Sequence, residues 1–259
     1  MTYKSAAPAS SPVTVLAFDS STAVFAAAVL RNGAVEASSQ LFTERNHSVH
    51  VVAEMKRLLE QCGLKPENVD VVAVGQGPGS YTGVRIAVTA GKTLAWTWNK
   101  PLIGVSSLEA LALGAWQSSD KPGGKVWVVP VMDARRGQVY TSRYTADSAG
   151  HWQTLDADEI RMAAEWALLL RNEAATLGDV SEIWFVGDTT VHELALVSTD
   201  TAGGVPVRAI PFAMEAGAVG SLAMLRHGRG EKDDVHTFVP NYTQLAEAEA
   251  KLQAAARRE

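Results

Sequence analysis

The sequence predicts an α/β fold of two similar lobes, each with the element order βββαβα. Each half of the chain opens with an apolar strand that ends in an aspartate and returns through a second strand. Compact β-branched runs then alternate with apolar residues at helical spacing. Such alternation is typical of parallel strands joined by crossover helices, so we expect a cleft between two lobes. The 259 residues are enough for both lobes.

The first half begins as a three-stranded meander and continues as alternating helices and strands. A tight Asn32-Gly33 turn joins the second and third strands. The β-branched run at 69–74 is typical of a central strand. In chain order we expect strands at 13–19, 24–30 and 35–42, a helix over 51–62, a strand at 69–74, a helix over 82–98 and a strand at 101–105.

The second half repeats this design. Its first strand ends in Asp133, as the first strand of the chain ends in Asp19, so the two aspartates are candidate counterparts. An alternating strand follows each of them. We expect strands at 125–132, 138–144 and 183–186, and an apolar helical face at 163–170.

Domain boundaries follow from the repeat. Residues 1–12 are rich in Ser, Ala and Pro and predict a disordered tail. We place the first lobe at 13–107 and expect a helix from about 211–228 to complete it. The second lobe then comprises 108–210 and 229–259.

Composition indicates an ordinary globular protein of the cytoplasm. The net charge of −5 gives no overall attraction to nucleic acid, so we expect RNA to be held mainly by another protein. The single cysteine, Cys62, rules out an intramolecular disulfide and reads as a buried thiol. The sequence contains neither the apolar core of a secretory signal nor an apolar run long enough to span a membrane.

The glycine-rich segment GQGPGSYTGVR, residues 75–85, follows a buried strand and opens a helix. Backbone N–H groups at a helix N-terminus can hold an anion, and glycine allows its close approach. The spacing matches neither a Walker P-loop, a dinucleotide fingerprint nor a nucleophile elbow. A tight turn that needs positive φ angles is the alternative. The candidates for a nucleotide or anion site are Asp19, Gly77, Gly79, Ser80, Thr82, Gly83 and Asp133.

Seven sequence blocks carry a family resemblance. They are VLAFDSST at 15–22, NHSVH at 46–50, GPGSYTGVRI at 77–86, GK at 91–92, PLIGVSSLEALA at 101–112, MDARRGQVY at 132–140 and PNYTQLAEAEA at 240–250, in which Gln244 stands where many members of the family have an arginine. Together they resemble the bacterial TsaB family, also called the YeaZ-like proteins, over nearly the whole chain. The resemblance implies the actin-like fold of ASKHA and RNase H-like proteins, in agreement with the duplicated lobes.

The resemblance also implies a function. TsaB-family proteins support the formation of threonylcarbamoyladenosine at position 37 of tRNAs that read codons beginning with A. They pair directly with TsaD, the catalytic paralogue that binds metal and transfers the threonylcarbamoyl group, and an ATPase, TsaE, joins the complex. The resemblance therefore implies that this chain holds no catalytic residue and no metal. ATP and metal belong to the partner subunits, and tRNA is reached through the complex.

Metal binding by the chain itself is disfavoured by its histidines. TsaD carries an HxxxH pair of metal ligands, whereas His47 and His50 are three residues apart. Two ligands fall short of the four typical of a structural zinc site and the three typical of a catalytic one. Helix capping or a polar interface contact is the alternative role for this pair.

Two helices are candidates for the partner interface. Small residues at three- and four-residue spacing between Gly83 and Ala95 allow another helix to approach closely. The same face can instead pack on the protein's own sheet. Without its partner, such an apolar face favours self-pairing, so we expect a homodimer of the isolated chain. The interface candidates are Val51, Met55, Leu58, Val88, Gly91 and Lys92.

Other interpretations remain open at this stage. Asp19 resembles the aspartate that holds a metal-nucleotide in actin-like ATPases, but it can equally accept N–H bonds in its own turn. Arg135 and Arg136 can contact tRNA or an acidic partner, or simply form a solvated face. An ATP-dependent phosphotransferase, a metallopeptidase-like hydrolase, and a nucleotide- or tRNA-binding module are the alternative function classes.

Overall fold

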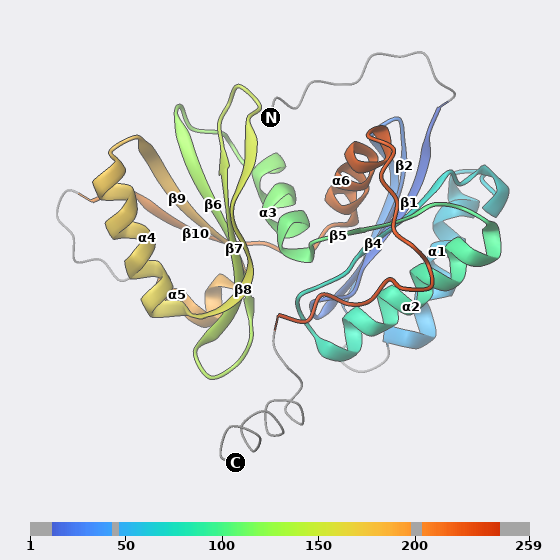
Figure 1. Cartoon of the computed structure of the whole chain (residues 1–259), viewed down its shortest axis with the longest axis horizontal. Helices are drawn as coiled ribbons and strands as arrows, with labels where there is room; N and C mark the ends of the chain where they lie inside the picture. The colour runs from blue at the N-terminus through green and yellow to red at the C-terminus, as the bar shows by residue number, and fades with distance from the viewer. Residues whose placement is uncertain (1–11, 43–46, 198–203, 244–259) are drawn as a thin grey trace.

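The computed structural model describes residues 12–42, 47–197 and 204–243. It has two lobes, each built on a five-stranded mixed sheet (Figure 1). The predicted actin-like α/β fold with duplicated lobes is confirmed. Except for Pro12, the predicted tail lies outside the described residues.

The two sheets share one topology. The first has the strand order β3-β2-β1-β4-β5, and the second has the matching order β8-β7-β6-β9-β10. In each, three antiparallel strands are followed by two strands parallel to the first. The elements of the first half are β1 (Thr14–Asp19), β2 (Val24–Arg31), β3 (Ala34–Phe42), α1 (His47–Gln61), η1 (Pro66–Asn68), β4 (Val71–Gly75), α2 (Tyr81–Trp98), β5 (Leu102–Val105) and α3 (Ser107–Gln117).

The second half repeats this order, but two of its edge strands and its five-residue helix were not predicted. Its elements are β6 (Lys125–Asp133), β7 (Gln138–Ala146), β8 (Trp152–Met162), α4 (Ala163–Leu177), β9 (Val180–Gly187), η2 (Thr189–His192), α5 (Glu193–Val197), β10 (Val207–Pro211) and α6 (Ala216–Gly228). The edge strands β8 and β10 were not predicted because neither contains a fully buried residue. Helix α3 was not predicted because it is buried on almost every side and therefore lacks a polar stripe.

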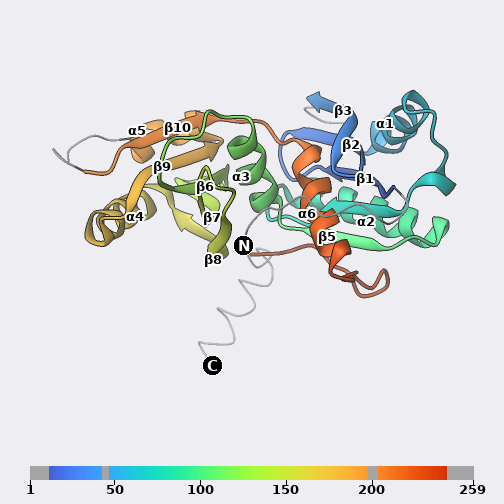
Figure 2. The ribbon, with the colours of Figure 1, turned by 90° about the horizontal axis from the view of Figure 1, so that it is seen from above.

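Helices α3 and α6 lie between the two sheets (Figures 1 and 2). Helix α3 leaves the first sheet but packs on β6, β7 and β9 of the second. Helix α6 comes from the end of the chain and packs on β1 and β2 of the first sheet. Helices α1 and α2 cover the outer face of the first sheet, and α4 and α5 cover that of the second. Each lobe thus buries apolar side chains on both faces of its sheet.

A C-terminal strap, defined here as residues 231–242, runs along the N-terminal lobe. The Asp233 N–H donates to the Leu102 carbonyl over 2.8 Å, and the Asp233 carboxylate accepts from the Gly104 N–H, also over 2.8 Å. Phe238 is 8% exposed and packs among the core residues under α2. Residues 229–259 were expected in the second lobe, but residues 233–238 lie on the first, because β5 offers backbone partners and the core under α2 takes up Phe238.

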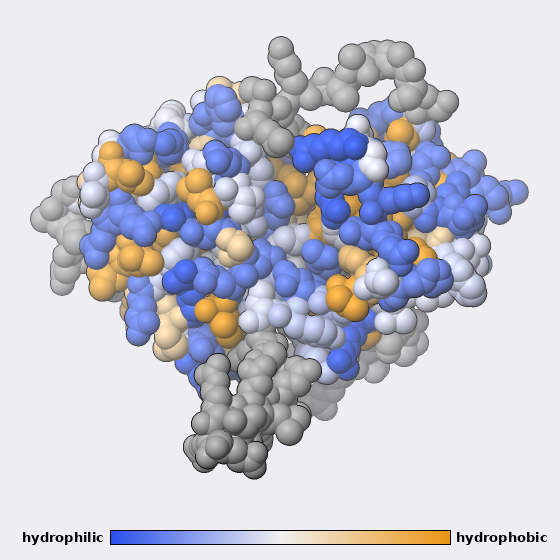
Figure 3. Space-filling view, viewed as in Figure 1, coloured by the Kyte–Doolittle hydropathy of each residue, from blue (hydrophilic) through white to orange (hydrophobic). Residues whose placement is uncertain are grey.

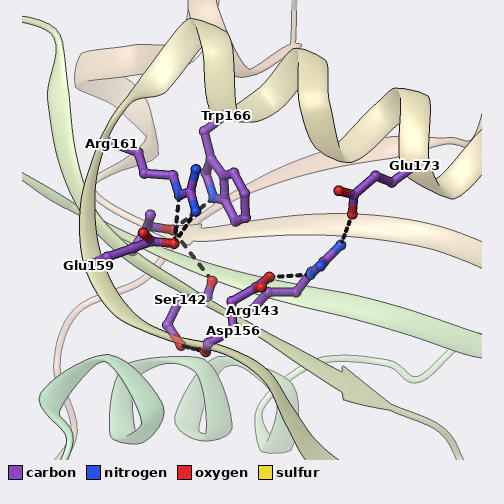
Figure 4. Close-up of polar contacts among 8 residues, drawn as sticks. Ser142, Arg143, Asp156, Glu159, Arg161, Trp166 and Glu173 are labelled. Carbon is purple, nitrogen blue, oxygen red and sulfur yellow. Dashed lines mark hydrogen bonds and ion pairs between the residues drawn. The ribbon is translucent and has the colours of Figure 1, made fainter.

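Trp166 and two arginines hold α4 to its sheet (Figure 4). Arg143 lies between Asp156 and Glu173, each at 2.6 Å, so it ties β8 and α4 to β7. The Arg161 guanidinium stacks 4.3 Å from the Trp166 ring centroid. The Trp166 indole N–H donates to Thr141 over 3.1 Å. The outer layer of the second lobe is therefore fixed by polar contacts as well as by burial.

The strap generates a stability prediction. Replacing Phe238 with Ala removes an aromatic ring from the core, so we expect a loss of about 3 kcal/mol in the free energy of unfolding. The matched control is Val239→Ala at the neighbouring position, where the side chain is 64% exposed. Urea denaturation measures both variants. Equal stabilities would show that the strap does not belong to the core.

Candidate functional site

The glycine-rich loop is held against the turn between β1 and β2. The Ser80 N–H donates to the Ser21 carbonyl over 2.7 Å, and the Ser20 hydroxyl donates to the Gly83 carbonyl over 2.6 Å. A Cβ at Gly79 would lie 2.3 Å from the Ser21 carbonyl oxygen, and one at Gly83 would lie 1.8 Å from that of Ser20. Both distances are far below van der Waals contact. These glycines therefore allow two backbone segments to touch.

Asp19 lies beneath this contact and is fully buried. One carboxylate oxygen accepts from the Ser21 N–H and hydroxyl, each over 2.6 Å, and the other accepts from the Ser107 hydroxyl over 2.5 Å. Burial raises the pKa of Asp19, although the hydrogen bonds from Ser107 and Ser21 oppose that rise. The carboxylate thus faces donors of its own chain and does not line the cleft between the lobes.

Ser107 extends this network to the start of α3. Its hydroxyl accepts from the Gly77 N–H over 3.0 Å, and its own N–H donates to the Gly77 carbonyl over 2.9 Å. Ser80 caps α2 by accepting from the Gly83 N–H over 3.3 Å. Sequence reasoning missed Ser107. Its signal was the Ser106-Ser107 pair, which precedes an apolar run as a helix cap does.

A cleft of about 520 Å³ opens between the lobes beside this network. The first lobe contributes Ser21 to Ala23 and Gly79 to Thr82, and the second contributes Met132 to Arg135, Tyr140 and Asp188. The structure therefore brings together Gly79, Ser80, Thr82 and Asp133 from the predicted anion site. Asp19, Gly77 and Gly83 lie outside its lining.

Asp133 has different surroundings from its topological counterpart Asp19. Its side chain is 34% exposed, and one oxygen lies 3.0 Å from Nε2 of the buried His192. That oxygen also accepts from the Arg135 N–H over 3.1 Å, while Asp188 accepts from the Asp133 N–H over 3.0 Å. The floor of the cleft in the second lobe is therefore acidic. Within the described residues, no three His, Cys, Asp or Glu side chains meet where they could hold a metal ion.

Two blocks that are far apart in the sequence meet at the rim of the cleft. The Arg85 guanidinium lies 3.9 Å from the Tyr81 ring centroid, and its Nε donates to the Tyr242 hydroxyl over 2.7 Å. The two tyrosine rings are 5.8 Å apart. Sequence reasoning did not pair these residues, because nothing local links position 242 to the glycine loop.

The Asp19 network generates the second prediction. Asp19→Ala would leave two hydroxyls and one N–H without their acceptor in a buried site, so we expect a loss of about 3 kcal/mol in the free energy of unfolding. Asp19→Asn keeps one acceptor oxygen and should lose less. Thermal denaturation of both variants measures the difference. Near wild-type stability of the alanine variant would contradict a structural role for this carboxylate.

Known protein families account for most of the chain. The family model described as "TsaD: tRNA N6-adenosine threonylcarbamoyltransferase" matches residues 40–252. The tRNA threonylcarbamoyladenosine biosynthesis protein TsaB of Bacillus subtilis is 35% identical over 242 residues, which cover 92% of this chain and 97% of that protein. The chain belongs to the TsaB family. The resemblance drawn from the sequence blocks is confirmed.

Other relatives separate the TsaB family from the transferases. Escherichia coli TsaB is 31% identical over 66% of this chain and 73% of its own length. The structure of YeaZ from Pseudomonas aeruginosa matches with a TM-score of 0.71 and 25% identity, covering 89% of this chain and 99% of YeaZ. The tRNA N6-adenosine threonylcarbamoyltransferase of Anaeromyxobacter dehalogenans is 31% identical, but over only 46% of its own length. The chain thus matches whole TsaB proteins and part of that transferase.

Membership of the TsaB family assigns the protein to tRNA threonylcarbamoyladenosine biosynthesis. Among the described residues, none of the helices combines the length and apolar character that crossing a bilayer requires.

The six interface candidates of this TsaB-family chain face its own core or strap. Val51, Met55, Leu58 and Val88 are each at most 4% exposed and pack in the cluster under α1 and α2. A Cβ at Gly91 would lie 3.3 Å from Val74, so bulk there would disturb the sheet. The Lys92 ammonium donates to the carbonyls of His236 and Phe238 in the strap. These residues thus pack within their own lobe, which is the alternative that the sequence left open for this face.

Acidic groups join the lobes on another side of this TsaB-family fold. Asp158 of β8 accepts from the Asn241 amide in the strap over 2.9 Å and from the Ser106 hydroxyl. Glu109 lies nearby and accepts from the Trp152 indole N–H over 3.1 Å. Burial, with a contribution from Glu109, raises the pKa of Asp158 to about 6. Burial also raises the pKa of Glu109.

Asp158 generates a pH prediction. Its folded pKa of about 6 lies above the ordinary value of 3.8, so the unfolded chain ionises first as the pH rises. Ionisation between about pH 4 and about pH 7 then costs the folded state up to roughly 3 kcal/mol. We expect the wild-type Tm to fall across this interval, and that of Asp158→Asn to fall less. Calorimetry over this pH range measures the Tm of both proteins. If the two Tm values fall in parallel with pH, Asp158 does not cause the fall.

Proposed function

We propose that this chain is the non-catalytic partner subunit of the threonylcarbamoyl transferase complex, which forms threonylcarbamoyladenosine at position 37 of tRNAs reading codons beginning with A. TsaD docks on it directly, TsaE joins the complex, and tRNA is bound by the assembly in the cytoplasm. ATP and metal belong to the partner subunits. Two features favour a non-catalytic role. The chain matches TsaB proteins over their length, and Asp19 is enclosed by hydrogen-bond donors of its own chain.

The observation that carries the proposal is an apolar groove between α1 and α2. It has a volume of about 380 Å³ and is lined mainly by apolar side chains, among them Val52, Leu59, Leu94 and Trp98. Val52 is 60% exposed, on the face of α1 that points away from the sheet. A groove between two helices can accept the apolar face of a third. The partner therefore meets groove residues such as Val52; of the six interface candidates predicted from the sequence, Met55 alone lines this groove.

The same groove accounts for the proposed homodimer of the isolated chain. A second copy can cover an exposed apolar surface through a two-fold contact when the true partner is absent. On the face drawn in Figure 3, exposed apolar side chains form small groups separated by polar ones. The α1–α2 groove can therefore be tested by changing single residues that line it.

The test places a charge in the groove without entering the core. Val52→Asp should weaken binding to TsaD at least tenfold, because docking would bury an unpaired carboxylate. It should also convert the isolated homodimer to monomer. Val191→Asp, at a valine 68% exposed on the second lobe, is the matched control. Calorimetric titration and analytical ultracentrifugation measure the two effects.

Reconstituted transfer provides the functional measurement. Threonylcarbamoyl transfer to tRNA by TsaD and TsaE should require the wild-type chain and fall with Val52→Asp in proportion to complex formation. Full transfer by TsaD and TsaE alone would refute the subunit role. ATP turnover by the purified chain would instead favour the stand-alone enzyme.

A further inference from the structure

The loop between β6 and β7 holds two arginines in an unfavourable backbone conformation. Arg135 and Arg136 have φ angles of 67° and 55°, and Gly137 follows with 76°. Side chains other than glycine are disfavoured there, because Cβ crowds the backbone. The other non-glycine residues at positive φ in the described chain are Asn32 and Asn99, a residue type that tolerates it. Two successive arginines therefore occupy positions where Gly or Asn would strain the backbone less.

Both arginine residues are exposed, Arg135 in the lining of the cleft and Arg136 next to it in the chain. Among the described residues, neither guanidinium lies within ion-pair distance of a carboxylate, in contrast to Arg143 and Arg226. Their charges are not used to hold the hairpin together. The turn needs positive φ angles but not arginine, so the choice of arginine points to a role for the side chains.

The opposite rim carries aromatic rings beside a third arginine. Tyr81 lines the same cleft as Arg135 and is 51% exposed, while Tyr242 is 46% exposed. Arg85 stacks on Tyr81 and donates to the Tyr242 hydroxyl. The cluster thus combines a cation held by both tyrosines with two half-exposed aromatic side chains. Between the rims lie Asp133 and Asp188, which repel an anion from the floor and leave the rims as its contact points.

We infer that the Arg135–Arg136 loop and the Tyr81–Arg85–Tyr242 cluster form a contact surface for a single-stranded stretch of the tRNA substrate. Guanidinium groups match phosphate oxygens in a two-pronged geometry, and aromatic rings stack on unpaired bases. A duplex would offer the rings no free base face. The inference rests on the proposed function and adds a direct RNA contact made by this subunit. The contact is local, since the chain as a whole is acidic with a net charge of −5.

The experiment uses the reconstituted complex of this chain with TsaD and TsaE, and an unmodified tRNA transcript as the probe. Arg135→Gly/Arg136→Gly should weaken tRNA binding about tenfold and lower the salt slope of log Kd by about two, because two phosphate contacts are lost. Arg135→Lys/Arg136→Lys should recover part of the affinity through charge alone. Fluorescence anisotropy at several salt concentrations measures these changes.

Two controls separate the contact from folding and from overall charge. The glycine variant should have an unchanged or slightly higher Tm, because glycine relieves the backbone strain. Lys121→Gln/Arg208→Gln removes two positive charges elsewhere on the second lobe and should leave the salt slope unchanged. Ultraviolet crosslinking of the wild-type complex should attach RNA to Tyr81 or Tyr242.

The outcomes distinguish this inference from the proposed function. An intact complex whose glycine variant binds tRNA with wild-type affinity and salt slope overturns the inference alone. A glycine variant that loses TsaD and not tRNA shows that the arginines contact an acidic protein surface, which also overturns it. If the wild-type chain fails to join TsaD at all, the proposed function falls. Crosslinking and anisotropy with the chain alone then decide the RNA contact separately.

Discussion

The buried carboxylate of Asp19 is the contact on which the arrangement of the first lobe depends. Its two oxygens receive three hydrogen bonds from the β1–β2 turn and the start of α3. A charged or protonated carboxyl group at full burial is tolerated only with such partners. Because Ser107 also bonds Gly77, this single group fixes the end of a strand, a loop and a helix relative to one another.

The duplicated topology makes the difference between the two lobes informative. Asp19 and Asp133 end equivalent strands, yet one is enclosed and the other stands partly exposed on the cleft floor beside His192. In the first lobe, the β1–β2 turn is covered by the glycine loop, which contacts Ser20 and Ser21. In the second lobe, the equivalent β6–β7 turn is exposed and carries Arg135 and Arg136. The cleft therefore has a closed wall of backbone contacts on one side and a charged rim on the other.

Periodicity predicted the strands and helices that have one buried and one exposed face. It failed for elements whose two faces are equally buried or equally exposed. The alternating strand after Asp133 and the helix after the glycine loop were placed correctly, whereas the almost wholly buried α3 and the edge strand β8 carry no such contrast. For the site, the loop glycines were identifiable because they lie between a buried strand and a helix. Ser107 and Tyr242 were not, because their partners lie far along the chain. The side of α1 that faces outward was misjudged, since Val51 and Val52 are both apolar and only packing decides which is buried.

The exchange of α3 and α6 between the lobes sets the order in which the chain can finish folding. The second sheet is formed by residues 125–211 and finds its inner helix just before them in the sequence. The first sheet has emerged from the ribosome much earlier, but its inner face waits for α6 and its β5 edge for the strap. The lobe that is synthesised first is therefore the one completed last, and a growing chain carries an uncovered apolar sheet until α6 has been synthesised.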